Sequence, residues 1–274
     1  MKYTIKDFAR DFGTDDQCLE YVFKKRFKVR GFYRIKNRLA YGNSKGKQIY
    51  PLKGTIFERS STPLSLWFYA IYLFSQSRHG VSAMELQRQL GVTYKCAFRI
   101  GHKIRSLMKE KEPAKFTGIV ECDEAYVGGK RRLAVRGRSS KNKTPVFGIV
   151  QRGGKVHAEA MDNIQSETLI RILKKRVNKG SKIITDGFSA YKPLKWEGFK
   201  HKSVNHSKWE YVRQEGKLSI NTNTIEGFWG QLKRQFNGTH YFVSRQHLSK
   251  YLDEVVFRYN HQGEQLFSSI LEKV

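Results

Sequence analysis

The apolar segment Phe116-Thr-Gly-Ile-Val-Glu-Cys-Asp-Glu124 ends in three acids within four residues. Side chains alternate between the two faces of a β-strand, so a strand here puts Glu121 and Asp123 on one face and Glu124 on the other. A carboxylate at the end of an apolar strand is a hard oxygen ligand that suits Mg²⁺ or Mn²⁺. The segment therefore predicts either a metal site or a solvated strand end whose acids pair with the basic residues at 130–132.

The neighbouring segments predict a mixed sheet flanked by helices. Strand-like runs lie at 118–122, 145–151, 156–161 and 182–185, and Gly153-Gly154 is typical of a hairpin turn. Ser166 is expected to cap a helix that has apolar residues at 169, 172, 173 and 177. Three strands, a helix, a fourth strand and further helices predict an α/β layer, and a ribonuclease-H-like core has the same order.

A second acid, Asp186, follows the strand expected at 182–185 and precedes Gly187. Taken alone, Asp-Gly is a turn signal. Two strands of one sheet that each end in Asp can bring both carboxylates to one edge. The spacing of Asp123 and Asp186 along the chain does not by itself show that they meet.

A third acid, Glu226, lies in the helical segment 221–234. In one interpretation Asn223 caps this helix and Glu226 is its capping-box partner. In the other interpretation, Glu226 and Lys233 lie two turns apart on one face of the helix, and Trp229 lies near that face. The face then offers a carboxylate to bind a metal and a cation to bind a phosphate. That pairing suits phosphodiester chemistry, in which two metal ions activate the attacking oxygen and stabilise the leaving one.

The chain has 274 residues and a net charge of +28, and its basic residues occur along the whole length. So many positive charges repel one another in the folded chain, which indicates that they bind a polyanion. Nucleic acid is favoured as that partner over an anionic membrane, and over the alternative that the charge serves only solubility. The longest apolar run, 63–74, has about 12 residues, too short for a membrane helix of roughly 20.

The segment 128–143 has no acid and predicts a loop that binds phosphates, or else a solvated hairpin extension. Its basic residues are Lys130, Arg131, Arg132, Arg136, Arg138, Lys141 and Lys143.

Residues 82–93 predict a helix-turn-helix. Ser82 and Glu85 are spaced as a capping box, Gly91 predicts a turn, and Thr93 is expected to cap the second helix. Two helices that only pack around a glycine turn would give the same pattern. The second helix offers several side chains able to reach base edges and phosphates: Tyr94, Lys95, Arg99, His102, Lys103 and Arg105.

Cys18, Cys96 and Cys122 are far apart and never form a C-x-x-C pair, so they predict buried free thiols and neither a disulfide framework nor a zinc site. The first residues have no apolar stretch of the kind found in a secretory signal, which favours a cytoplasmic protein.

Six stretches extend these motifs over nearly the whole chain: Val120-Glu-Cys-Asp-Glu-Ala-Tyr-Val-Gly-Gly-Lys130, Thr185-Asp-Gly-Phe-Ser-Ala-Tyr191, Val204-Asn-His206, Asn223-Thr-Ile-Glu-Gly-Phe-Trp229, Leu232-Lys-Arg234, and Tyr251-Leu-Asp-Glu254 with Phe257-Arg-Tyr-Asn260. In this order they resemble the ISXO2-like transposases of the IS1595 insertion-sequence family. The resemblance implies a ribonuclease-H-like DDE transposase, a DNA-associated protein of the bacterial cytoplasm.

By the same resemblance, Asp123, Asp186 and Glu226 hold two Mg²⁺ or Mn²⁺ ions and Lys233 is the basic residue of the site. Some branches of the family carry Asn at the third position, so Asn223 stays the alternative to Glu226, and Arg234 is expected to contact DNA. The implied reaction cuts DNA at the ends of the element and joins the freed 3′ hydroxyl to target DNA. The implied partners are double-stranded DNA, as terminal inverted repeats and target, and further copies of the chain in a dimer or higher oligomer.

One departure concerns the N-terminal part, where relatives carry a zinc ribbon of two Cys pairs. Gly54-Thr-Ile-Phe57 is present, but Phe27–Pro51 has no cysteine, so structural zinc is expected to be absent. The segment must then rely on its aromatic residues: Phe27, Phe32, Tyr33, Tyr41 and Tyr50. Three domains are expected: a helix with a degenerate ribbon at 1–60, a helix-turn-helix region at 61–111 and a catalytic domain at 112–274.

Two other functions compete with transposition. A DNA-binding protein derived from a transposase would not transfer strands; the missing cysteines favour it and the three intact acids oppose it. A general ribonuclease-H-like nuclease would cut without a particular end sequence.

Overall fold

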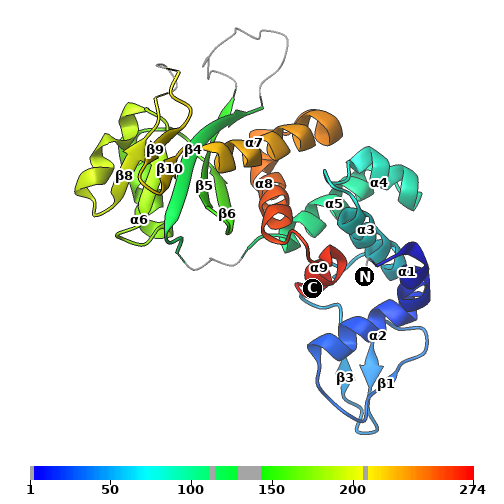
Figure 1. The fold of residues 1–274 in the computed structure, drawn as a ribbon. Helices are drawn as coiled ribbons and strands as arrows, with labels where there is room; N and C mark the ends of the chain where they lie inside the picture. The colour runs from blue at the N-terminus through cyan, green and yellow to red at the C-terminus, as the bar shows by residue number, and fades with distance from the viewer. Residues whose placement is uncertain (1–2, 111–114, 129–142, 206–208) are drawn as a thin grey trace. The chain divides into compact units, whose positions relative to one another are not determined.

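The computed structural model describes residues 3–110, 115–128, 143–205 and 209–274 (Figure 1). They form two compact units, one made of residues up to 108 together with 263–274 and the other of residues 109–262. No helix in these described ranges is long and apolar enough to cross a membrane. The domain boundaries expected at 60 and 111 stay predictions, and the C-terminal helix α9 belongs to the first unit.

In several helices of the first unit, the side chain of the N-cap residue accepts a hydrogen bond from the first turn. Thr4, Thr14, Ser82 and Thr93 each accept a hydrogen bond from a backbone amide three residues further on. Gly91 ends α4 with φ at 63°, a left-handed conformation that glycine adopts without a Cβ clash. The two helices and the turn expected around 82–93 are therefore present, and their role in DNA binding stays a prediction. The helices are α1 (Ile5–Phe12), α2 (Asp15–Arg26), α3 (Leu64–Gln76), α4 (Ala83–Leu90), α5 (Tyr94–Leu107) and α9 (Leu266–Leu271).

The cysteine-free segment forms a small antiparallel sheet that packs on α2. The ring of Tyr41 stacks on Phe23, with centroids 3.8 Å apart and planes within 8°. Tyr41 is buried, whereas Tyr33 and Tyr50 are exposed, so the expectation that these aromatics form a core holds for the first and is wrong for the other two. The strands are β1 (Tyr33–Arg34), β2 (Tyr41–Gly42) and β3 (Gln48–Ile49), in the order β1-β2-β3.

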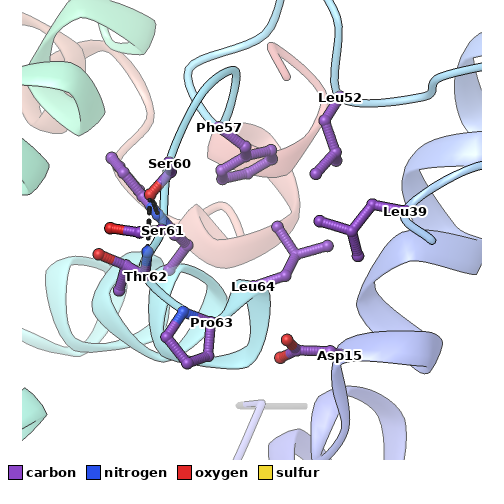
Figure 2. Close-up of a pocket in the computed structure, with 10 residues that line it drawn as sticks. Asp15, Leu39, Leu52, Phe57, Ser60, Ser61, Thr62, Pro63 and Leu64 are labelled. Atoms are coloured by element: carbon purple, nitrogen blue, oxygen red, sulfur yellow. Dashed lines mark hydrogen bonds between the residues drawn. The ribbon is translucent and has the colours of Figure 1, made fainter. Parts of the chain in front are cut away.

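A pocket of about 180 Å³ lies where α2, the loop after β3 and the start of α3 meet (Figure 2). Phe57 and Leu64 form apolar parts of its wall, and Asp15 lies at one side. The Asp15 carboxylate already accepts hydrogen bonds from the amide and hydroxyl of Ser65. This carboxylate thus joins α2 to α3.

The second unit contains a five-stranded sheet in the order β6-β5-β4-β7-β8. The strands β4, β5 and β6 are antiparallel neighbours, whereas β4, β7 and β8 run parallel. The hairpin expected at Gly153-Gly154 connects β5 to β6. The strands are β4 (Ile119–Val127), β5 (Thr144–Gln151), β6 (Val156–Ala160), β7 (Lys182–Thr185) and β8 (Lys200–Ser203), with a separate hairpin of β9 (Arg213–Glu215) and β10 (Leu218–Ile220).

Helices cover both faces of this sheet, which gives the α/β layers that the sequence predicts. On one face, Val120 and Cys122 of β4 pack with α6 (Ser166–Arg176) and the 3₁₀ helix Ser189–Trp196. On the other, Ala125 packs with α7 (Asn223–Gln235) and α8 (Arg245–Asn260). A π-helical turn, Phe236–His240, links α7 to α8.

Three local expectations about this unit are wrong. The strand expected to end at Cys122 continues to Val127, so Asp123 lies inside β4 and pairs with Gly148 of β5. The N-cap of α6 is Gln165, because the Ser166 hydroxyl donates instead to the carbonyl of Ala190. The N-cap of α7 is Thr222 and not Asn223.

Candidate active site

The register of the sheet places Asp123 on β4 and Asp186 just after the end of the neighbouring strand β7. Glu121 of β4 lies opposite Ile184 of β7 in a parallel pair. Asp123 and Asp186 each lie two residues beyond these partners, and neighbouring strands are about 4.8 Å apart. The Asp186 carboxylate also accepts a hydrogen bond from the amide of Phe188 at 2.9 Å, so the turn expected at Asp186-Gly187 is present.

Glu226 approaches the same place from the first turn of α7. Its carboxylate accepts the hydroxyl of Thr222 at 2.8 Å. One turn further on, the Trp229 indole donates from Nε1 to Oδ2 of Asp123 at 3.0 Å. The helix that carries the third acid is thus bonded directly to the strand that carries the first.

The pKa of Asp123 reflects this grouping. Burial, with smaller contributions from the negative charges of Asp186 and Glu226, raises the pKa of its carboxyl group to about 6, although the Glu124 amide and the Trp229 indole lower it. The register of β4 and β7 and the bond from Trp229 thus place the end of β7 and α7 beside Asp123, and the meeting of the three acids in one site stays a prediction.

Gly148 makes the contact between α7 and the sheet possible. It lies opposite Asp123 on β5, and a Cβ at this position would lie 2.6 Å from Cζ2 of Trp229 and 2.9 Å from Cδ1 of Ile225. Real Cβ atoms do not approach carbon that closely. A side chain here would push away the indole that bonds to Asp123.

Glu121 lies on the same face of β4 as Asp123, as the alternation predicts, but its surroundings differ. It is fully buried, and its Oε1 accepts Nε of Arg152 at 2.6 Å. Its Oε2 accepts the amides of Thr224 and Ile225 at 2.8 and 3.0 Å. The sequence grouped Glu121 with the candidate metal ligands and gave no role to Arg152, because their partners lie far away along the chain.

The basic residues of α7 are exposed. Lys233 lies two turns after Glu226, and the Arg234 guanidinium lies close to Gly230. Among the residues that the structure describes, no three His, Cys, Asp or Glu side chains converge as a ready metal site. Each of the three acids is held by a hydrogen bond to a neighbouring protein group.

The candidate DNA-contacting residues of α5 divide by exposure. Tyr94, Lys95 and Arg99 are exposed, and Lys103 is half-buried and donates to the carbonyl of Ile56 at 2.9 Å. His102 and Arg105 are buried, so the expectation that they reach DNA is wrong. Arg105 donates to the carbonyl of Val81 at 2.8 Å and lies over the ring of Phe74.

Of the seven basic residues expected in the phosphate-binding loop, Lys143 is exposed at the start of β5. Lys130, Arg131, Arg132, Arg136, Arg138 and Lys141 lie outside the described residues.

Comparison with known proteins identifies a family that matches more than half of this chain. The family model of the ISXO2-like transposase domain matches residues 115–260. An uncharacterized protein in transposable element ISH50 of Halobacterium salinarum is 29% identical over 238 residues, which are 80% of this chain and 78% of that protein. An uncharacterized transposase-like protein of Haemophilus influenzae is 32% identical over 123 residues, 44% of this chain and 93% of that protein. Among solved structures, the Mos1 strand transfer complex aligns over 74% of this chain and 73% of that one, with 11% identity and a TM-score of 0.34.

Proposed function

We propose that this chain, which belongs to the ISXO2-like transposase family, cuts DNA at the ends of an insertion sequence and transfers the freed 3′ strand to target DNA. The observation that carries the proposal is the position of Asp123 on β4, next to the strand that Asp186 follows and bonded through Trp229 to the helix that contains Glu226. Acids placed together on a strongly basic chain fit a reaction on a polyanion.

The topology of the sheet supports a ribonuclease-H-like core. Numbered in chain order within this sheet, the strands lie in the order third, second, first, fourth, fifth, and only the second runs opposite to the others. The first strand carries Asp123, and Asp186 directly follows the fourth strand, which is its parallel neighbour. The helix with Glu226 covers the same face.

The donor set fits hard divalent cations. Carboxylate oxygens from Asp123, Asp186 and Glu226 are ligands of the kind that Mg²⁺ and Mn²⁺ prefer, and their mutual repulsion favours a bound positive charge. Two such ions would activate the attacking oxygen and stabilise the leaving oxygen of the phosphodiester. The protein's own part is to hold these acids: Trp229 keeps one Asp123 oxygen in place, and α7 presents Lys233 to a phosphate.

The DNA partners proposed are the terminal inverted repeats and the target duplex, bound in the cytoplasm. Tyr94, Lys95 and Arg99 form an exposed row on α5 that suits contacts with base edges and phosphates. Lys143 and Arg234 are exposed in the sheet domain and suit contacts with phosphates. Two ends must be joined to one target, so we propose that the active assembly contains at least two copies of the chain.

One observation favours a second function, that of a transposase-derived DNA-binding protein without strand transfer. Within the described ranges the three acids do not form a ready metal site, and each is bonded to a protein group. A protein that has lost its reaction would keep the basic surface and the fold.

Strand cleavage and joining by purified protein separates the two functions. The substrate is labelled DNA with the sequences that flank the gene, with Mg²⁺ or Mn²⁺, and the variants are Asp186→Asn, Glu226→Gln and Asn223→Ala. Nicking at a defined end that is lost in the first two variants and kept in the third supports the proposal and the choice of Glu226. Salt-sensitive binding without metal-dependent cutting would support the DNA-binding protein, and cutting without regard to end sequence would support a general nuclease.

A further inference from the structure

We propose that Glu121 and Arg152 are positioning residues, which fix the first turn of α7 against β4 and so determine where the Glu226 carboxylate meets Asp123. The inference rests on the proposed function, because it concerns the surroundings of the same three acids. It gives Glu121 a role different from that of Asp123, although both lie on one face of β4.

The hydrogen bonds of Glu121 exclude it as a further metal ligand. Each of its carboxylate oxygens accepts two bonds: Oε2 from the amides of Thr224 and Ile225, and Oε1 from Nε of Arg152 and from the Thr224 hydroxyl at 2.9 Å. A carboxylate has about four lone-pair sites. The side chain is fully buried and its acceptor capacity is used.

Arg152 extends this contact to the chain that leads into α7. Besides Glu121, its guanidinium donates to the carbonyl of Ser219 at 2.6 Å and to that of Asn221 at 2.9 Å. One ion pair therefore holds both the first amides of the helix and the residues that precede it. Arg152 follows β5 in the hairpin to β6, so three parts of the domain meet here.

The start of α7 differs from that of α5. Thr93 caps α5 with its own hydroxyl, whereas Thr222, the N-cap of α7, makes no side-chain bond to the first-turn amides. Glu121 accepts two of those amides instead, and the Thr222 hydroxyl donates to Glu226. A negative charge at a helix N-terminus is favourable, and here the charge comes from the sheet. The position of α7 is thus coupled directly to the strand that carries Asp123.

Removing one member of a buried ion pair leaves the other charge without compensation. Glu121→Gln should release the first turn of α7 and leave Arg152 with a weaker acceptor. The Glu226 carboxylate would then be held less well relative to Asp123. Residues that orient the ligands of a metal typically change metal affinity about 10- to 100-fold when they are mutated.

The test compares Glu121→Gln with Glu254→Gln in the full chain. Glu254 is also fully buried and paired with an arginine, Arg258, at 2.7 Å, but it lies in α8. Two quantities are measured: hydrogen exchange at the Thr224 and Ile225 amides without metal, and the Mg²⁺ concentration that gives half-maximal cleavage. Arg152→Lys provides a second variant, which keeps a cation beside Glu121 but cannot reproduce the guanidinium's three directed bonds.

We expect Glu121→Gln to speed exchange at both amides and to raise the half-maximal Mg²⁺ concentration about tenfold, with Arg152→Lys changing both in the same direction. Glu254→Gln should lower the melting temperature without either change. If Glu121→Gln and Glu254→Gln lower the melting temperature equally and neither alters the Mg²⁺ requirement, Glu121 is only structural and the inference is wrong.

Failure of the proposed function gives a different result. In that case the unmutated chain itself shows no metal-dependent cleavage. The amide exchange then decides whether Glu121 fixes the start of α7, since that measurement needs neither metal nor DNA. Unchanged exchange at Thr224 and Ile225 would overturn the inference in either case.

Discussion

The first and second turns of α7 both contact β4, but under opposite electrostatic conditions. At the first turn, Glu121 meets two amides, a hydroxyl and a guanidinium, and its negative charge is fully compensated by the protein. At the second turn, Asp123 accepts hydrogen bonds from the Trp229 indole and the Glu124 amide, while burial and the charges of Asp186 and Glu226 raise its pKa. Two acids separated by one residue thus have different surroundings: Glu121 is bonded to the start of the helix, and Asp123 is the one that we propose binds an external cation.

The largest effect should come from removing a charge at the second turn. Asp123→Asn should reduce cleavage about 1,000-fold or more, because a ligand of the proposed metal ions is lost. A gel assay with labelled element ends measures this. Asp162→Asn, which removes a highly exposed carboxylate of the same unit, is the matched control and should cut normally.

The packing that brings the two regions together depends on Gly148. Gly148→Ala should lower the free energy of unfolding by about 1–3 kcal/mol, because the new methyl group overlaps Trp229 and Ile225. Urea denaturation measures the difference. Gly227→Ala, which adds a methyl group to α7 in open space, should be neutral or slightly stabilising; equal losses in both variants would contradict this account.

The raised pKa of Asp123 predicts how the stability of the metal-free protein depends on pH. Below about pH 4 the carboxyl group is protonated in both the folded and the unfolded chain, so it adds no penalty. Between pH 4 and 6 the carboxyl group of Asp123 is ionised in the unfolded chain but still protonated in the folded chain. The free energy of unfolding therefore falls over this range and stays lower at higher pH.

Asp123→Asn should therefore stabilise the metal-free protein at pH 7 by about 1–2 kcal/mol, a figure reduced for the partial exposure of this group. It should have little effect at pH 4. Denaturation in EDTA at the two pH values checks this, and equal effects at both would contradict the raised pKa.

The smallest effect is expected at the N-cap of α7. Thr222→Val should cost about 0.5–1 kcal/mol, the usual contribution of one hydrogen bond, because the hydroxyl binds Glu226 and does not cap the helix. Thr93→Ala should cost about 1 kcal/mol, as expected for a true cap. A larger loss at Thr222 than at Thr93 would show that α7 is capped locally after all.

Periodicity and local turn signals predicted much of this molecule. They gave the strand with Glu121 and Asp123 on one face, the hairpin at Gly153-Gly154 and the α/β layers. The caps expected at Ser166 and Asn223 were wrong because the residues that settle them lie elsewhere in the chain: the carbonyl of Ala190 accepts the Ser166 hydroxyl, and Glu121 accepts the amides of α7.

The candidate site was predictable as a set of acids but not as a geometry. The motifs identified Asp123, Asp186 and Glu226, whereas only the register of β4 and β7 shows that the first two are neighbours. The sequence pattern also did not predict that Arg105 is buried, and the reason is related. A helix pattern cannot show that a carbonyl such as that of Val81 lies ready to accept a buried guanidinium.

The capping of α7 by Glu121 also has a consequence that we expect for the order in which the domain assembles. A helix of 13 residues is marginal in water on its own, and this one receives two of its first-turn hydrogen bonds from a strand formed about a hundred residues earlier in the chain. Closing such a long loop is slow compared with forming a local cap. We therefore expect Glu226 to reach its final position only after the sheet has formed, so that a partly synthesised or partly folded chain would lack the complete set of acids that the proposed reaction needs.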